Sequence, residues 1–327
     1  MTRVHAGIDV GGTTTHVVLT DETFSPVGFA STATPALAGG DAILAAATTL
    51  LSGLLDGSGA GNRGENRNRD GNRAGNDYEL VSVGLGTAGV VDTLAGTILV
   101  VSDSFAGWAG HPVRSVLESR YAVPVAVEND VNAFLVGEMY AGAGVGSTHA
   151  LGITLGTGVG GALWLDGALY TGPGGAAGEI GHTPGYGSRP CTCGGHGHLE
   201  TLAAGRSISR LYRERTGRSL EASAVSAAAL AGDPDARKIF ATLGEALAQA
   251  VSVTTGLLDI DTVVIGGGVT NGWDSFAPTV FHSLAVEPPV RGHSPRVVKA
   301  LLGDSSVAIG SAIIGAGSRQ PAARIGG

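Results

Sequence analysis

Charged side chains are scarce in this sequence. They make up 15% of the 327 residues, the net charge is −8 at pH 7, and we find no basic stripe. Binding to nucleic acid needs clustered lysine and arginine, because the phosphates must be neutralised. No apolar run approaches the roughly 20 residues of a membrane-spanning helix, and no positively charged leader precedes the first strand-like stretch. The composition therefore speaks against nucleic-acid and membrane partners, and we expect a compact cytoplasmic protein.

Cysteine is also scarce, since only Cys191 and Cys193 occur. One intervening residue would badly strain a disulfide between them, so a metal is the favoured use. His182 and His198 flank the pair in a Gly-rich loop, and the four side chains would suit tetrahedral zinc. His196 competes with His198, because neighbouring glycines permit either. A loop without metal is the alternative, since reduced cysteines need no partner, but little else would order this loop.

Two glycine-rich segments of the same design are the most informative feature of the chain. They span residues 7–15 and 151–161, and the β-branched and apolar stretches around each predict two β-hairpins. A Gly/Thr turn exposes backbone N–H groups and hydroxyls that can hold phosphate oxygens. Neither segment is a Walker loop or a Rossmann turn. An ordinary β-turn explains either segment alone, but the recurrence favours a nucleotide site formed by Asp9, Gly11, Gly12, Thr13, Thr14, Gly156, Thr157 and Gly158.

A third glycine run, at Gly266, Gly267 and Gly268, follows an apolar strand predicted over 262–265. Glycine has no side chain to obstruct a ligand, so this turn would admit a flat ring such as adenine. We expect it to hold the nucleoside.

The alternation of strands and helices in both halves predicts two related α/β lobes. We expect a smaller lobe at 1–128 and a larger one at 129–305, with a C-terminal helix within 306–327 packing back on the first. Residues 57–77 are almost entirely Gly, Asn, Arg, Glu and Asp, and are interpreted as a flexible surface insertion. Helices are predicted over 41–55, 113–120, 130–140, 200–216, 235–258 and 306–316, and further strands over 80–85 and 123–127.

Asp130 follows an apolar strand, at the end where parallel α/β sheets gather their ligands. A helix N-cap is the alternative, because Asn and Asp commonly begin helices. Three further polar residues, Glu128, Asn129 and Asn132, crowd the same strand end, which is more than one cap requires. A carboxylate here could accept the proton of an alcohol that attacks a γ-phosphate.

Together these segments resemble the ROK family of sugar kinases and repressors. Asp-Val-Gly-Gly-Thr at 9–13 and Leu-Gly-Thr-Gly-Val-Gly-Gly at 155–161 match its two phosphate motifs, and Gly-Gly-Gly at 266–268 matches its adenosine motif. The resemblance covers nearly the whole chain apart from the insertion. It implies a two-lobe, actin-like (ribonuclease H-like) ATPase fold of the hexokinase type, with a zinc-binding loop. It also implies ATP, Mg²⁺ and structural Zn²⁺, and a homodimer.

The resemblance implies roles for single residues as well. Glu-Asn-Asp at 128–130 matches the catalytic segment, so Asp130 would be the general base and Asn129 a sugar contact. Glu-Ile-Gly-His at 179–182 matches the family's Glu-x-Gly-His, so Glu179 and His182 would contact sugar hydroxyls while His182 also binds zinc. Glu200 would be the remaining sugar contact, and Asp9 would sit near magnesium.

Two positions depart from the family pattern. His198 stands where the family usually has a third cysteine, which predicts a retained zinc site with altered geometry. Ser104 stands where the family commonly supplies an Asn to the sugar. The shorter side chain enlarges that corner of the sugar site or lets Asp103 enter it.

The sequence therefore predicts an ATP-dependent sugar kinase, a phosphotransferase with an alcohol acceptor. Its substrate would be a hexose or hexose derivative, phosphorylated at the 6-hydroxyl with Asp130 as general base. A sugar-responsive ROK repressor is one alternative, although it would need a helix-turn-helix and the sequence begins at the first hairpin. An actin-like sugar-binding module without kinase activity is the other, although it would need neither Asp130 nor two phosphate hairpins.

Overall fold

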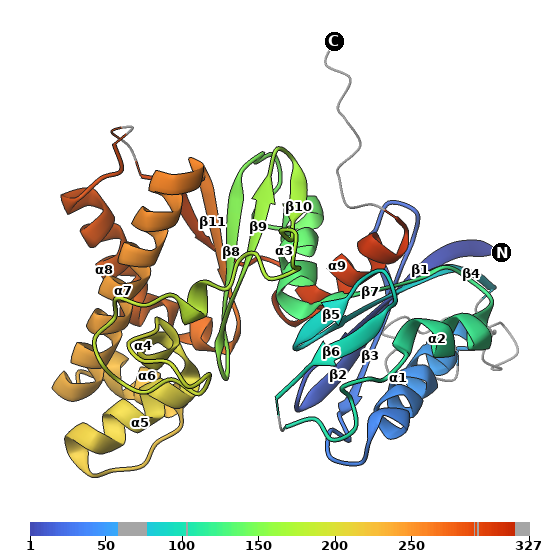
Figure 1. Ribbon diagram of the computed structural model, residues 1–327, viewed down its shortest axis with the longest axis horizontal. Coiled ribbons are helices and arrows are strands. Elements are labelled where there is room, and N and C mark those ends of the chain that lie inside the picture. Colours follow the sequence, from blue (N-terminus) through green and yellow to red (C-terminus); the bar gives the residue numbers. More distant parts are fainter. Residues whose placement is uncertain (58–76, 103, 291, 293, 318–327) are drawn as a thin grey trace, which may run out of the picture. The chain divides into compact units, whose positions relative to one another are not determined.

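A computed structural model describes residues 1–57, 77–102, 104–290, 292 and 294–317. Most of the predicted insertion at 57–77, Asp103 and residues 318–327 lie outside the described residues. Contacts within the chain divide it into two compact units (Figure 1). The first comprises Met1–Val145, Gly172–Ala176 and Asp304–Gly327, and the second comprises Gly146–Thr171 and Ala177–Gly303.

The first unit is built on a five-stranded sheet in the order β3-β2-β1-β4-β7. Its first three strands form an antiparallel meander, and β4 and β7 run parallel to β1. The strands are β1 (Thr2–Val10), β2 (Thr14–Thr20), β3 (Pro26–Ala33), β4 (Tyr78–Thr87) and β7 (Val125–Asn129), with a separate ribbon of β5 (Val90–Asp92) and β6 (Thr97–Val100). The helices of this unit are α1 (Gly40–Leu55), α2 (Val113–Tyr121), α3 (Asp130–Ala141) and α9 (Ser306–Gly315).

The second unit repeats this arrangement. Its sheet has the order β10-β9-β8-β11-β12, again an antiparallel meander continued by two parallel strands. The strands are β8 (Ala150–Leu155), β9 (Val159–Leu165), β10 (Ala168–Tyr170), β11 (Thr262–Gly266) and β12 (Arg296–Lys299). The helices are α4 (Glu200–Ala203), α5 (Gly205–Thr216), α6 (Ala222–Leu230), α7 (Pro234–Leu258) and α8 (Trp273–Val286), and its short 3₁₀ turns are η1 (Ile180–His182) and η2 (Gly268–Gly272). A third 3₁₀ turn, η3 (Gly303–Ser305), lies at the boundary between the two units. The shared strand order confirms the prediction of two related α/β architectures.

Helix α9 fixes where the first unit ends. Nearly all of its residues are buried, and it packs on β1, β4 and α3 (Figure 1). Glycines permit this close approach, because a Cβ at Gly84 would overlap the Ser311 carbonyl and a Cβ at Gly310 would overlap the Ala133 carbonyl. Ser306 Oγ also donates a hydrogen bond to Glu138 Oε1 at 2.8 Å. The boundary therefore differs from the expected one at 128/129, since these contacts hold α3 in the first unit.

The predicted helix over 200–216 is interrupted. Ala204 is extended, with φ −73° and ψ 150°, and separates α4 from α5. The break frees Gly205 N to donate to the carbonyl of Gly156 at 2.8 Å. A tertiary hydrogen bond thus outweighs the helix propensity of alanine. Within the described residues, no helix is both long and apolar enough to cross a membrane.

Candidate active site

The first predicted hairpin is confirmed, with β1 and β2 paired antiparallel on either side of a turn at residues 11–13. Gly11 N donates to the carbonyl of Thr14 at 3.1 Å and closes the turn. Gly12 and Thr13 are exposed at its tip, and an added Cβ at Gly12 would meet only the ring of Phe105, 3.8 Å away. The tip therefore offers open backbone to a ligand, as a phosphate-binding turn requires.

The strand register places Asp9 opposite His16. His16 Nδ1 lies 3.5 Å from Asp9 Oδ2, and both side chains are largely buried. Burial raises the pKa of the Asp9 carboxyl, an effect that His16 opposes. Asp9 in turn raises the pKa of His16, and the charge of Asp304 adds to that shift. The carboxylate is thus held away from water at a site where a cation would stabilise it.

The predicted catalytic segment joins β7 to α3. Asn129, not Asp130, is the N-cap of α3, because its Oδ1 accepts from Val131 N at 2.8 Å and from Asn132 N at 3.2 Å. Asn129 Nδ2 also donates to the Gly89 carbonyl at 3.0 Å. Asp130 is the first helical residue and is partly exposed. The N-cap position that the sequence offered as the alternative for Asp130 is therefore occupied by Asn129.

The other polar residues of this segment brace it. Glu128 is buried, and its Oε1 accepts from Asn129 N and from Asn132 Nδ2, each at 3.0 Å. The crowding of polar groups at this strand end thus has a local cause besides any ligand. It fixes the backbone on which Asp130 stands.

Ser104 lies on the segment before α2, in the first unit. Its Oγ is 2.5 Å from Ser102 Oγ, and both residues are exposed. Trp108, four residues on, is fully buried and donates from Nε1 to Thr87 Oγ1 at 2.9 Å. The tryptophan of the predicted motif is therefore a core residue, whereas Ser104 is exposed.

The second predicted hairpin, between β8 and β9, is also confirmed. Gly156 N donates to the carbonyl of Gly158 at 2.9 Å, and Thr157 is exposed at the tip. Gly267 has φ +86° and lies against the end of β8, where a Cβ would sit 2.6 Å from the Leu155 carbonyl oxygen. The turn of the second hairpin and the glycine run at 266–268 therefore adjoin within one unit.

A small cavity of about 150 Å³ opens beside this glycine run. Gly268 and Val269 from η2, together with residues of α6 and Phe240 of α7, form its wall. Nothing lies within 4 Å of an added Cβ at Gly268, so the backbone there faces open space. The turn thus presents open backbone, and its use by a flat ring stays a prediction.

Glu200 joins the second hairpin to the cysteine loop. Its buried carboxylate accepts from Val159 N at 3.1 Å and from Thr192 Oγ1 at 3.0 Å, and it pairs with Arg206. Burial raises the pKa of Glu200, but the N–H of Val159 and the charge of Arg206 outweigh it, so the net pKa is lowered. Glu200 is therefore a charged residue that ties three segments together.

Glu179 and His182 are placed by a short turn against β9. Gly181 allows this, because a Cβ there would overlap the Val159 carbonyl at the base of the hairpin. Glu179 precedes η1 and is exposed, while His182 ends η1 and is partly buried. The motif at 179–182 thus sits beside the phosphate turn.

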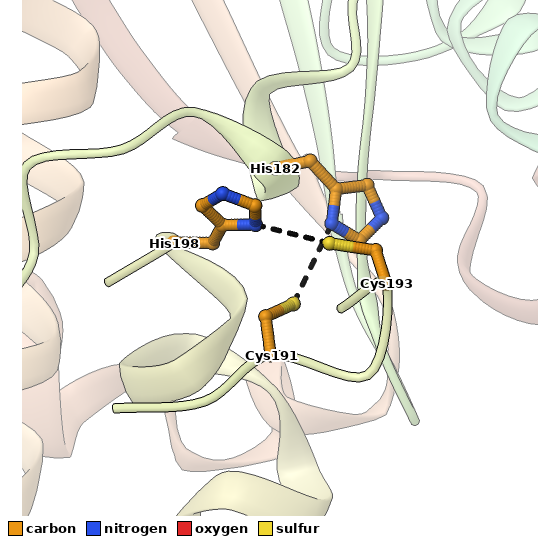
Figure 2. Close-up of side chains that lie close together, drawn as sticks. All are labelled: His182, Cys191, Cys193 and His198. Carbon is orange, nitrogen blue, oxygen red and sulfur yellow. Dashed lines mark hydrogen bonds between the residues drawn. The ribbon is translucent and has the colours of Figure 1, made fainter. Parts of the chain in front are cut away.

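Four side chains gather as expected for the metal site (Figure 2). His182, Cys191, Cys193 and His198 each offer one ligand atom, and these atoms lie within 4.8 Å of one another. Cys191 Sγ is 3.7 Å from His182 Nδ1, and Cys193 Sγ is 3.2 Å from His198 Nδ1. Two sulfur and two nitrogen donors are the number and kind that tetrahedral zinc takes in structural sites. The cluster suggests such a site.

The geometry distinguishes between His196 and His198 as the fourth ligand of the cluster. His198 belongs to the cluster, and Gly195 makes room for its ring, since a Cβ there would overlap Cε1. His196 instead forms an isolated β-bridge with Pro190 and is exposed. Of the two, only His198 has a nitrogen close to both cysteines.

Arg206 and His16 are functional-site residues that no sequence motif pointed to. Arg206 pairs with Glu200 across a helix break that no pattern announces, so nothing in the sequence pointed to it. His16 could have been found from the hairpin itself, because a turn at 11–13 sets the register that puts it opposite Asp9.

Solved structures similar to this chain define its fold class. The chain resembles the crystal structure of a ROK family glucokinase from Streptomyces griseus in complex with glucose and AMPPNP, with a TM-score of 0.78, 26% identity, and coverage of 96% of this chain and 100% of that one. A ROK hexokinase from Thermus thermophilus gives a TM-score of 0.78 and 26% identity, covering 96% and 98%. The fold is the actin-like fold of hexokinases.

The family follows from the sequence comparison. The ROK family model matches residues 72–317, and the chain belongs to this family. It is 31% identical over 251 residues to a glucokinase of Halalkalibacterium halodurans, covering 71% of this chain and 75% of the relative. It is 32% identical over 245 residues to an N-acetyl-D-glucosamine kinase of Pasteurella multocida, covering 71% and 80%. The chain is an ATP-dependent sugar kinase.

Proposed function

We propose that this kinase transfers the γ-phosphoryl group of ATP to the 6-hydroxyl of a hexose or hexose derivative, with Asp130 as general base. The observation that carries the proposal is the cap of α3. Asn129 caps the helix, and Asp130 stands next to it at the carboxyl end of β7, where its Oδ1 accepts from Val131 N at 3.0 Å. The strand end is where parallel α/β sheets bind ligands.

In the proposed step the Asp130 carboxylate accepts the proton of the sugar hydroxyl. The hydroxyl oxygen forms a bond to the γ-phosphorus while the anhydride bond to the β-phosphate breaks, leaving ADP. The turn amides at Gly12 and Gly158 would orient phosphate oxygens, and Gly266, Gly267 and Gly268 would leave room for the adenosine.

The residues fit a magnesium ion at Asp9, whose buried carboxylate a cation would stabilise. Magnesium, when bound, would neutralise charge on the phosphates. His16 keeps the carboxylate in place from the opposite strand.

For sugar recognition we propose Ser104, Asn129, Glu179, His182 and Glu200. The names of the relatives, glucokinase and N-acetyl-D-glucosamine kinase, support a hexose or a 2-acetamido hexose as the substrate class. The paired hydroxyls of Ser102 and Ser104 leave an open, polar corner that suits a substituent on the sugar. Zinc, held by His182, Cys191, Cys193 and His198, would fix this loop when bound.

A coupled ADP-release assay over a panel of sugars tests the proposal. We expect turnover with glucose, N-acetylglucosamine or a close analogue, and a product whose phosphate is on carbon 6 by ³¹P–¹H NMR correlation. Phosphorylation at another hydroxyl would refute the regiochemistry. Sugar binding without turnover on any member of the panel would favour a regulatory protein.

A further inference from the structure

Arg206 has no role in the proposed function, yet its guanidinium reaches a buried group of the candidate site. It is the second residue of α5 and follows the break at Ala204 that ends α4. Its side chain is 41% exposed, whereas that of Glu200 is 6% exposed. Arg206 Nη2 pairs with Glu200 Oε1 and also donates to Thr192 Oγ1 at 3.0 Å. A cation at the surface thus extends inward to a buried carboxylate.

The carboxylate that Arg206 pairs with lies directly against the turn of the second hairpin. Glu200 Oε2 accepts from Val159 N at 3.1 Å, and a Cβ added at Gly158 would lie 2.6 Å from the same oxygen. That added Cβ would also lie 3.8 Å from Arg206 Nη2. Both members of the ion pair therefore border the backbone whose N–H groups the proposed function gives to phosphate.

The charge of Glu200 would oppose a phosphate at this turn. Like charges repel, and burial keeps water from screening the repulsion. Glu200 also takes up the N–H of Val159, a donor next to the turn. Within the described residues, Arg206 is the one cation that forms an ion pair with Glu200. Arg206 therefore offsets the charge that would otherwise repel the nucleotide.

Thr192 holds the ion pair in place. Its hydroxyl donates to Glu200 Oε1 at 3.0 Å and accepts from Arg206 Nη2 at 3.0 Å, so the three side chains form a closed ring of polar contacts. In the sequence Thr192 lies between Cys191 and Cys193, two members of the cluster in Figure 2. The orientation of the Glu200 carboxylate is thus set jointly by the cysteine loop and by α5.

We propose that Arg206 is a positioning residue of the kinase, which offsets the charge of Glu200 and fixes its orientation so that the carboxylate can bind a sugar hydroxyl beside a turn that binds phosphate. This role rests on the proposed function, which gives Glu200 to the sugar and the turn at 156–158 to the nucleotide. Arginine suits the role, because its planar guanidinium stays charged and donates hydrogen bonds in fixed directions. Arg206 thereby allows sugar and nucleotide to bind to neighbouring groups of the second unit.

Calorimetric titration of the full chain with AMPPNP, and with whichever of glucose and N-acetylglucosamine it phosphorylates, tests this role. Arg206→Met should lower the affinity for AMPPNP by at least about fivefold, the lower end of the usual coupling between two sites. It should lower the affinity for sugar by about tenfold, the effect of losing one charge-assisted hydrogen bond. Arg213→Gln is the control, because it removes the same charge about 10 Å further along α5, and it should change either affinity less than about twofold.

A second substitution separates charge compensation from a structural role. Glu200→Gln removes the negative charge but keeps an acceptor for Val159 N–H. The double variant Arg206→Met with Glu200→Gln should therefore bind AMPPNP within about twofold of the wild type, while its affinity for sugar stays low because the carboxylate is gone. Arg206→Lys keeps the positive charge and should bind AMPPNP better than Arg206→Met does. An arginine that only stabilised the fold would give no such recovery.

Three results would contradict this role. They are unchanged AMPPNP affinity in Arg206→Met, no recovery in the double variant, and equal losses in Arg206→Met and Arg213→Gln. Wild-type protein that phosphorylates no sugar would instead refute the proposed function, and the AMPPNP measurements would still decide whether Arg206 compensates the charge of Glu200. Circular dichroism checks that each variant is folded. Should Arg206→Met misfold, Arg206→Gln takes its place, because it keeps a polar side chain at this partly exposed position.

Discussion

Glu200 accepts a hydrogen bond from the backbone N–H of Val159, 3.1 Å from its Oε2. Its other oxygen, Oε1, accepts a hydrogen bond from Thr192 Oγ1 and pairs with Arg206. Cys191 Sγ lies 3.6 Å from the same oxygen. A single carboxylate therefore connects the base of the second hairpin to the loop that carries Cys191 and Cys193. A change at Glu200 would therefore reach both the turn and the loop.

Replacing Glu200 by Gln should destabilise the protein at neutral pH. The loss of the ion pair and of the charge-assisted bond from Val159 should cost about 1–3 kcal/mol. The pKa of Glu200 is lowered in the folded state, so its stabilisation is complete above the unfolded pKa of about 4.3 and is lost as pH falls through the folded pKa. The difference in Tm between wild type and variant should hold from pH 7 to about pH 5 and shrink below it. Glu179→Gln, at an exposed position, is the control, and a gap that does not depend on pH would contradict the assignment.

Asp130→Asn should keep sugar binding and lose most turnover. The amide preserves the shape of the side chain and removes its basicity, and general-base catalysis contributes about 10²–10⁴-fold. Steady-state kcat gives the rate, and calorimetric titration with the sugar gives the binding. Near-normal kcat in this variant would show that another group takes the proton.

Asn129 allows its two proposed roles to be separated. Asn129→Ala removes the cap of α3 and should cost about 1 kcal/mol, while Asn129→Ser keeps a capping oxygen and should cost much less. Both variants remove the amide, so both should raise the KM for sugar if Asn129 is a sugar contact. A raised KM in the alanine variant alone would instead mean that Asn129 acts by holding the helix.

Zinc removal should weaken sugar binding. Elemental analysis should find about one zinc per chain, and chelation or His198→Ala should lower sugar affinity by about 10–100-fold, the usual effect of disturbing a ligand set. His196→Ala is the matched control, because His196 lies outside the cluster, and it should retain zinc. Zinc should also be lost as pH falls, since protons compete for imidazole and thiolate. Full activity in protein that contains almost no zinc would rule out this role.

Sequence patterns predicted the turns and the cluster whose formation depends on residues near one another in the chain. The turns at 11–13 and 156–158 followed from glycine between apolar stretches, and His182, Cys191, Cys193 and His198 came together as their types suggested. The helix break at Ala204 escaped prediction, because alanine favours a helix and only the distant Gly156 carbonyl explains the break. The place of α3 in the first unit was not predicted either, because it depends on the contact of Gly310 with Ala133, which are far apart in the sequence.

The packing of α9 has a consequence for biosynthesis. This helix covers β1 and β4, yet a ribosome reaches Ser306 only after it has made the whole of the second unit. Until then the apolar strands from the beginning of the chain lack the helix that packs on β1 and most of what covers β4. The part of the chain that emerges first is therefore completed last, and in this interval its sheet exposes apolar surface of the kind that promotes aggregation.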